Sequence, residues 1–152
     1  MEHGSIEREI HVDAPPEVVF EVVSRPEHIR EWWPDEASFE PTAGAAGEIR
    51  FGDGATGKVE ALTVVAVEPP RLFSFRWVYE DGAMPTRDSS LLVTFELFEV
   101  DGGTTVRLTE TGFRERGWEV AQLEAAYQDH VRGWDFFVPR LGEYVARLVA
   151  TS

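Results

Sequence analysis

The stretch WEVAQLEAAYQDHVRGWDFFVPRLGEYVARLV, residues 118–149, decides the fold. Apolar side chains recur along it every seven residues, and others fill the intervals at spacings near three or four: Val120, Tyr127, Trp134, Leu141 and Leu148, with Leu123, Val131, Val138 and Val145 between them. This periodicity predicts one amphipathic helix, about 45 Å long. In a chain of 152 residues, a helix of that length must lie across the whole domain.

The bulk composition narrows the class of protein. The 152 residues suit one domain, residues 1–152, and a hydrophobic share of 43% is enough for a packed core. The absence of cysteine excludes disulfides, thiolate catalysis and cysteine-ligated metals. No segment has the pattern of a signal peptide or the ~20 apolar residues of a membrane span, so we expect a soluble, cytoplasmic protein.

Charge and motif spacing argue against several partners. The formal net charge of −14 opposes binding to nucleic acid or to anionic lipid, and Lys58 is the single lysine of the sequence. Histidine and acidic residues do not have the spacing of a metal site such as HExxH, and no phosphate-binding or dinucleotide-binding motif occurs. We therefore expect no metal, no cofactor, no nucleic-acid partner and no membrane insertion.

Upstream of the long helix, apolar and polar residues alternate as in strands. A strand is predicted over residues 5–12, followed by two short helices over about 15–23 and 26–32, with Asp13 and Ser24 as N-caps. Further strands are predicted over residues 48–51, 57–67, 71–79, 89–100 and 104–113. Hairpin signals separate them, Asp101-Gly102-Gly103 above all, which predicts antiparallel pairing. Residues 80–88 would be a lid or a mobile connection.

This order of elements predicts an α+β fold. A strongly curved antiparallel sheet of about seven strands would be covered on one face by the long C-terminal helix, with the two short helices directly after the first strand.

Five segments carry a resemblance to known proteins. They are IEREIHVDAPPEVVFEVVS at 6–24, EWWPD at 31–35, VEPPRLFSFRW at 67–77, LLVTFELFEVDGGTTVRLTETGF at 91–113 and GWDFFVPRL at 133–141. In their order and spacing they resemble the helix-grip fold of START domains and the birch-pollen-allergen superfamily, called SRPBCC. Within it they are similar to the family named after the activator of heat-shock protein 90 ATPase.

The resemblance implies a cavity between the sheet and the C-terminal helix. Members of the superfamily bind lipids, sterols, polyketides or plant hormones, and a few catalyse cyclisation or hydrolysis. The named activator carries this domain behind a separate N-terminal domain that makes essential chaperone contacts. The present chain has no room for that second domain, so we do not expect a chaperone partner.

Strand parity predicts which side chains line the interior. A shared inward face on the strands, together with the helix stripe, predicts a lining of Trp33, Phe75, Trp77, Tyr79, Phe95, Leu97, Leu108, Glu110, Tyr127, Trp134 and Val138. Aromatic stripes of this kind are usually packed core, and the alternative is a pocket held open by wide rings. Of the adjacent pair Trp32 and Trp33, one would be core and the other would cover an opening or rim.

Glu110 is the most informative single residue because its parity puts a carboxylate on an apolar face. A buried carboxylate must be paired, protonated or hydrated. Arg8 has the inward parity of the first strand, so an Arg8–Glu110 pair is one expectation, and a polar group that orients a ligand is another. Glu110 is also a candidate for a general acid or base, and His130 is a second one. We expect His130 at the rim of the helix stripe.

Three functions remain in view. The first is binding of a small hydrophobic or aromatic molecule, with no reaction assigned. The second is a cyclase-like or hydrolase-like enzyme that uses Glu110 on such a molecule. The third is an interaction protein that modulates a chaperone ATPase, which the polar outer face of the predicted sheet disfavours. Homodimerisation is compatible with each of them.

Overall fold

A seven-stranded antiparallel sheet covers one side of a 31-residue helix in the computed structural model of the chain, which describes residues 4–52, 58–79, 83–86 and 88–150. The strand order is β1-β7-β6-β5-β4-β3-β2, so the first strand lies beside the last. The strands span β1 Ser5–Val12, β2 Glu36–Ser38, β3 Ala46–Phe51, β4 Lys58–Glu68, β5 Leu72–Trp77, β6 Leu91–Val100 and β7 Gly103–Thr111.

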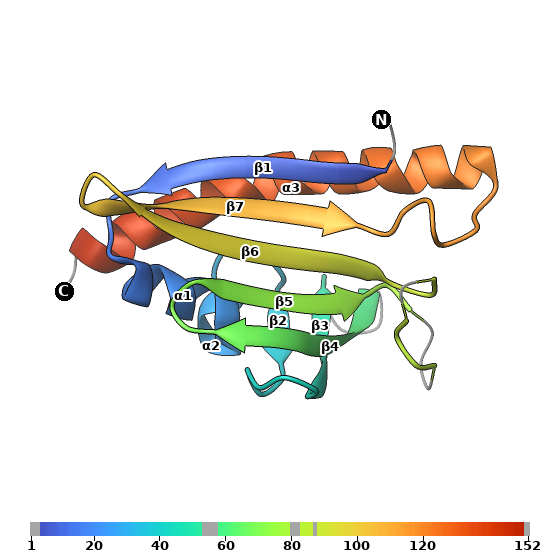
Figure 1. The fold of residues 1–152 in the computed structure, drawn as a ribbon, viewed down its shortest axis with the longest axis horizontal. Coiled ribbons are helices and arrows are strands. Elements are labelled where there is room, and N and C mark those ends of the chain that lie inside the picture. The colour runs from blue at the N-terminus through green and yellow to red at the C-terminus, as the bar shows by residue number, and fades with distance from the viewer. Residues whose placement is uncertain (1–3, 53–57, 80–82, 87, 151–152) are drawn as a thin grey trace.

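The helices lie behind this sheet in the view of Figure 1. Helix α3 (Val120–Ala150) runs along β1 and β7, whereas α1 (Pro16–Ser24) and α2 (Pro26–Ile29) close the end of the sheet near the C-terminal half of α3. The predicted α+β helix-grip fold, with two short helices after the first strand, is confirmed. Among the helices of the described residues, none combines the length and the hydropathy that a membrane span requires.

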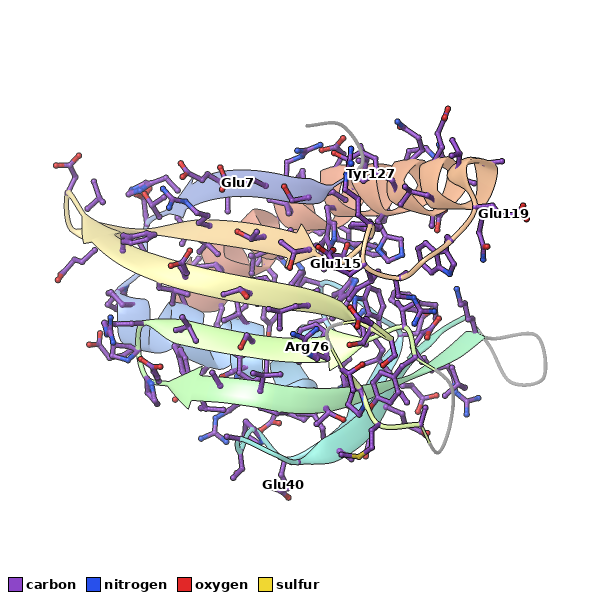
Figure 2. All side chains as sticks on the ribbon, turned by 45° about the vertical axis from the view of Figure 1, so that its right-hand side comes forward. Glu7, Glu40, Arg76, Glu115, Glu119 and Tyr127 are labelled. Atoms are coloured by element: carbon purple, nitrogen blue, oxygen red, sulfur yellow. The ribbon has the colours of Figure 1, made fainter. Side chains whose placement is uncertain are left out.

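Alternation along the central strands builds the core. In β6 the inward side chains Leu91, Val93, Phe95 and Leu97 are buried, and they face Trp134, Leu141 and Val145 of α3. Charged side chains such as Glu7 and Arg76 point from the opposite face of the sheet (Figure 2). Because the strand period is two, one face of the sheet is apolar and packs on the helix while the other meets solvent.

The predicted hairpin between the last two strands is present. Asp101 and Gly102 have φ of 50° and 80°, and Val100 pairs directly with Gly103. Two consecutive residues with positive φ make the tight turn whose twist matches that of the flanking strands. Asp and Gly are among the residues that adopt this conformation at low cost.

Several local predictions were wrong. The short strand β2 was missed, and α2 ends at Ile29 instead of near residue 32. Neither Asp13 nor Ser24 is an N-cap: α1 begins after Pro15, and the Ser24 hydroxyl donates to the Phe20 carbonyl at 2.6 Å. Three-residue strands and four-residue helices have too few residues for a periodic signal. Part of the predicted lid segment, residues 80–82 and 87, and the predicted start of β4 at residue 57 lie outside the described residues.

Truncating the helix stripe should destabilise the fold. Leu141 is 1% exposed, so Leu141→Ala should lower the free energy of unfolding by about 2–5 kcal/mol, because it leaves a cavity between α3 and the sheet. The matched control on the same helix is Val120→Ala, at a side chain 79% exposed, which should stay within about 0.5 kcal/mol of wild type. Urea unfolding measures both, and equal losses in the two variants would contradict the packing described.

Candidate functional site

A pocket of about 380 Å³ opens between α3 and the ends of β3, β4 and β5. Its inner wall is aromatic, and charged side chains stand among the lining residues. The lining consists of Trp33, Phe51, Lys58, Glu60, Trp77, Val78, Asp129, His130, Arg132, Gly133, Trp134 and Phe137. The volume falls at the lower end of the range for small-molecule sites, about 300–1,000 Å³.

Trp33 is the centre of the aromatic wall. Its ring centroid lies 5.1 Å from those of both Trp77 and Trp134, and 5.9 Å from that of Phe51. The neighbouring Trp32 is fully buried and donates its indole N–H to the Val22 carbonyl at 3.0 Å. Trp32 is therefore core and Trp33 is a pocket wall, which resolves the alternative left by the sequence.

Glu110 lies next to this wall, completely buried, and accepts three N–H groups. Trp77 Nε1 donates to Oε2 at 2.7 Å and Trp134 Nε1 donates to Oε1 at 2.8 Å. Nδ1 of His130 is also 2.8 Å from Oε1. Hydrogen bonds to both oxygens stabilise a carboxylate that would otherwise be costly to bury.

The fold brings these four side chains together from three elements. Glu110 is on β7 and pairs with Val93 of β6, while Trp77 is the last residue of β5 and pairs with Leu91. The Trp77 indole therefore reaches across β6 to Glu110. His130 and Trp134 are one helical turn apart on α3, so both project from the same face of the helix towards the sheet.

The expected Arg8–Glu110 pair is wrong. Arg8 does have inward parity, but its Nε donates to Asp135 Oδ1 on α3 at 2.7 Å, and its register partner on β7 is Leu108. Ile6 is the residue opposite Glu110. The Arg8 head group instead ties the edge strand β1 to the helix, where both partners remain partly exposed.

When protonated, His130 forms an ion pair with Glu110. The pKa of His130 is raised above its ordinary value of 6.5. Burial by itself lowers this pKa, since the side chain is only 15% exposed. The hydrogen bond to Glu110 and the negative charges of Glu110 and Asp129 outweigh burial, whereas Lys58 acts in the opposite direction. The sequence favoured a rim position for His130 over a catalytic role and missed its contact with Glu110.

The predicted lining residues divide into three groups. Trp33, Trp77 and Trp134 line the pocket, and Glu110 lies against two of them. Five others belong to the packed core around it: Phe75, Phe95, Leu97, Leu108 and Val138. The two tyrosines lie outside the pocket lining. The Tyr127 hydroxyl donates to the Ser5 carbonyl at 2.9 Å (Figure 2). The Tyr79 hydroxyl lies 2.6 Å from Thr63 Oγ1. Ligand binding by any of these residues stays a prediction.

Tyr79 departs from the expected parity because the strand ends before it. Val78 has φ of 60°, a left-handed conformation that β-branched residues rarely adopt. The left-handed conformation of Val78 breaks the alternation after Trp77 and turns Tyr79 towards Thr63. Thr63 pairs with Arg76, which is an outward residue of β5. Val78 itself lines the pocket, and unfavourable backbone conformations of this kind concentrate at functional sites.

Sequence reasoning missed most of the polar lining. Lys58 Nζ lies 3.1 Å from Glu60 Oε2, and Arg132 lies 3.8 Å from Asp129 in an exposed pair. In the sequence, only the four-residue spacing of His130 and Trp134 could have shown that these two side chains lie on one face of α3. Within the described ranges, no group of three or more His, Asp or Glu side chains is placed to hold a metal ion.

The Glu110–His130 contact predicts a pH-dependent stability. Because the pKa of His130 is raised in the folded protein, protonated His130 adds to the free energy of unfolding. This contribution is complete below the pKa of the unfolded chain, about 6.5, and is lost as pH rises through the folded pKa. NMR titration of the His130 ring protons, assigned with His130→Gln, should give a lower midpoint in Glu110→Gln than in wild type. An unchanged midpoint would show that Glu110 does not control this histidine.

Solved structures share this fold. Protein MLL2253 from Mesorhizobium loti is 26% identical, with a TM-score of 0.74 over 94% of this chain and 97% of that one. DynU16, from the dynemicin biosynthetic locus, is also 26% identical, with a TM-score of 0.71, and the match covers 94% of this chain but 47% of DynU16. The Aha1 dimer from Colwellia psychrerythraea is 20% identical, with a TM-score of 0.58 over 88% of this chain and 96% of that one, and shows the fold alone.

Sequence comparison gives the family. No curated protein sequence matches the chain. The family described as "Activator of Hsp90 ATPase homolog 1-like protein" matches residues 13–146, which include every lining residue of the pocket. The resemblance seen in the sequence is thereby confirmed, and the chain belongs to the family of Activator of Hsp90 ATPase homolog 1-like proteins.

Proposed function

We propose that the protein binds a small, flat, largely aromatic molecule in the pocket between α3 and the ends of β3, β4 and β5. The observation that carries this proposal is the wall of three indoles, Trp33, Trp77 and Trp134, around an unfilled volume of about 380 Å³. A volume of that size suits a ligand of one or two fused rings, whose faces would stack on the indoles.

The hydrogen bonding of the wall supports an apolar ligand. The indole N–H groups of Trp77 and Trp134 are both used by Glu110, so these two rings present their apolar surfaces to the pocket. The same hydrogen bonds hold the rings in place before a ligand arrives. Such preorganisation favours affinity, because little side-chain entropy is lost on binding.

The fold family gives independent support. The resemblance to SRPBCC proteins implies a cavity for hydrophobic molecules at the same place between sheet and helix. A cytoplasmic location and homodimerisation stay predictions, as does the absence of a chaperone partner. We assign no reaction to the pocket, and the enzymatic alternative depends on what His130 and Glu110 do to a bound molecule.

Gly133 offers a clean way to block the pocket. It lines the pocket from α3, and a Cβ added there would meet no atom within 4 Å. Beta-naphthol, which has two fused aromatic rings, serves as the probe. Gly133→Leu should place its side chain in the cavity without a clash and lower the affinity for beta-naphthol at least about tenfold, a change of about 1.4 kcal/mol. Quenching of tryptophan fluorescence measures the binding.

The matched control for this experiment is Gly133→Ala. It adds a single methyl group and should keep most of the binding while raising stability by about 0.5–1 kcal/mol through helix propensity. Equal binding of beta-naphthol by wild type and Gly133→Leu would contradict binding in this pocket.

Native mass spectrometry of the purified protein, before and after denaturing extraction, tests the proposal with the natural ligand. We expect a co-purifying mass of a few hundred daltons that is lost in Gly133→Leu. A co-purifying molecule retained in full by that variant would place its site elsewhere.

A further inference from the structure

We propose that the Glu110–His130 pair makes the pocket selective for aromatic molecules that carry an ionisable hydroxyl, such as phenols, and that Nε2 of His130 takes the proton of that hydroxyl. This inference rests on the proposed function, because it names the class of ligand that the same pocket holds. Its basis is a geometry that the proposed function does not require. The buried carboxylate of Glu110 contacts the imidazole of His130, and that imidazole lines the pocket.

The hydrogen bonds define which nitrogen of His130 is left for a ligand. The indoles of Trp77 and Trp134 can only donate, so both oxygens of Glu110 act as acceptors. A carboxylate has no hydrogen to donate, so with Glu110 ionised the hydrogen between it and His130 belongs to Nδ1. Neutral imidazole carries one N–H, so Nε2 holds a lone pair. It lies on the far side of the ring from Glu110, and His130 lines the pocket.

The neighbouring rings fix the orientation of the imidazole. The His130 ring centroid lies 5.4 Å from that of Trp77 and 5.4 Å from that of Phe113, which packs edge-on against it at 88°. Phe113 is fully buried. His130 is thus held between two aromatic walls and Glu110, an arrangement in which a buried carboxylate orients a histidine for proton transfer.

The proton transfer is balanced within the site. The O–H bond of the ligand breaks and its electron pair stays on the ligand oxygen, while a new N–H bond forms on Nε2 of His130. Glu110 takes no proton and keeps its three N–H donors. Glu110 and the ligand oxygen then lie on opposite sides of an imidazolium, and the total charge of the site is unchanged.

The charges around His130 come from three elements. Glu110 of β7 and Asp129 of α3 favour the imidazolium, and Lys58 of β4 disfavours it. Lys58 is paired with Glu60, and Arg132 also lines the pocket. Arg132 in turn pairs with Asp129, so each basic lining residue is balanced by a carboxylate that also lines the pocket, and the His130 imidazolium is the cation left for a ligand oxyanion.

The test compares beta-naphthol with its methyl ether, which has the same two rings and no acidic proton. At a pH above the folded pKa of His130 and below the pKa of free beta-naphthol, the naphthol bound to wild type should show the absorption of the naphtholate anion. Its affinity should exceed that of the ether by about tenfold or more, since a hydrogen bond between charged groups contributes about 1.5–3 kcal/mol.

Two variants identify the proton acceptor. His130→Gln should bind beta-naphthol as the neutral naphthol, with affinity close to that of the ether, and should still bind the ether, which shows that the pocket is intact. Glu110→Gln should weaken the naphtholate absorption and shift its onset to higher pH. The matched control His11→Gln changes an exposed histidine on β1 and should behave as wild type.

The outcomes separate this inference from the proposed function. If the naphthol and the ether bind wild type equally and the naphthol stays neutral, the inference is overturned and ligand binding stands. A naphtholate signal that persists in His130→Gln also overturns the inference, because another group then takes the proton. If neither compound binds, both the inference and the proposed function fail.

Discussion

The structure depends on one buried carboxylate held by three N–H donors. Glu110 projects from β7 into the space where β5, β7 and α3 meet, and no part of it is exposed. Burying an isolated carboxylate costs several kcal/mol or more, and each missing donor would restore part of that cost. The positions of Trp77, Trp134 and His130 are therefore linked to one another through a single side chain.

This constraint also forms the pocket. The two indoles that reach Glu110 are fixed by their N–H groups, and Trp33 packs against both of them at 5.1 Å. Rings held by polar contacts at one edge cannot turn freely to fill the space beside them, so the region next to them stays open. Buried aliphatic side chains and phenylalanines pack between α3 and the central strands elsewhere. The pocket with the indole wall thus lies where α3 carries His130, whereas a second hollow lies between β1 and the C-terminal part of α3.

The buried carboxylate of Glu110 gives the site a polar group that the apolar walls of the pocket do not supply. His130 connects the two, because it contacts Glu110 on one side and the cavity on the other. Ligand binding on the indoles and proton transfer to the imidazole would therefore be coupled functions of one arrangement. Solved structures of the same fold include an Aha1 dimer and a protein of the dynemicin biosynthetic locus, and a fold by itself does not select a ligand.

The sequence alone determined the architecture, because the seven-residue stripe of α3 and the alternation in β6 and β7 are periodic over nine residues or more. It also singled out Glu110 and three of the wall residues, since a carboxylate among inward apolar residues is visible from parity. Only the tertiary structure decided the partners. Arg8 pairs with Asp135 because α3 crosses β1 at that point, and His130 meets Glu110 because β7 and α3 lie together in space. Contacts between residues 20 or 127 positions apart depend on how elements cross. No local pattern of residues carries that information.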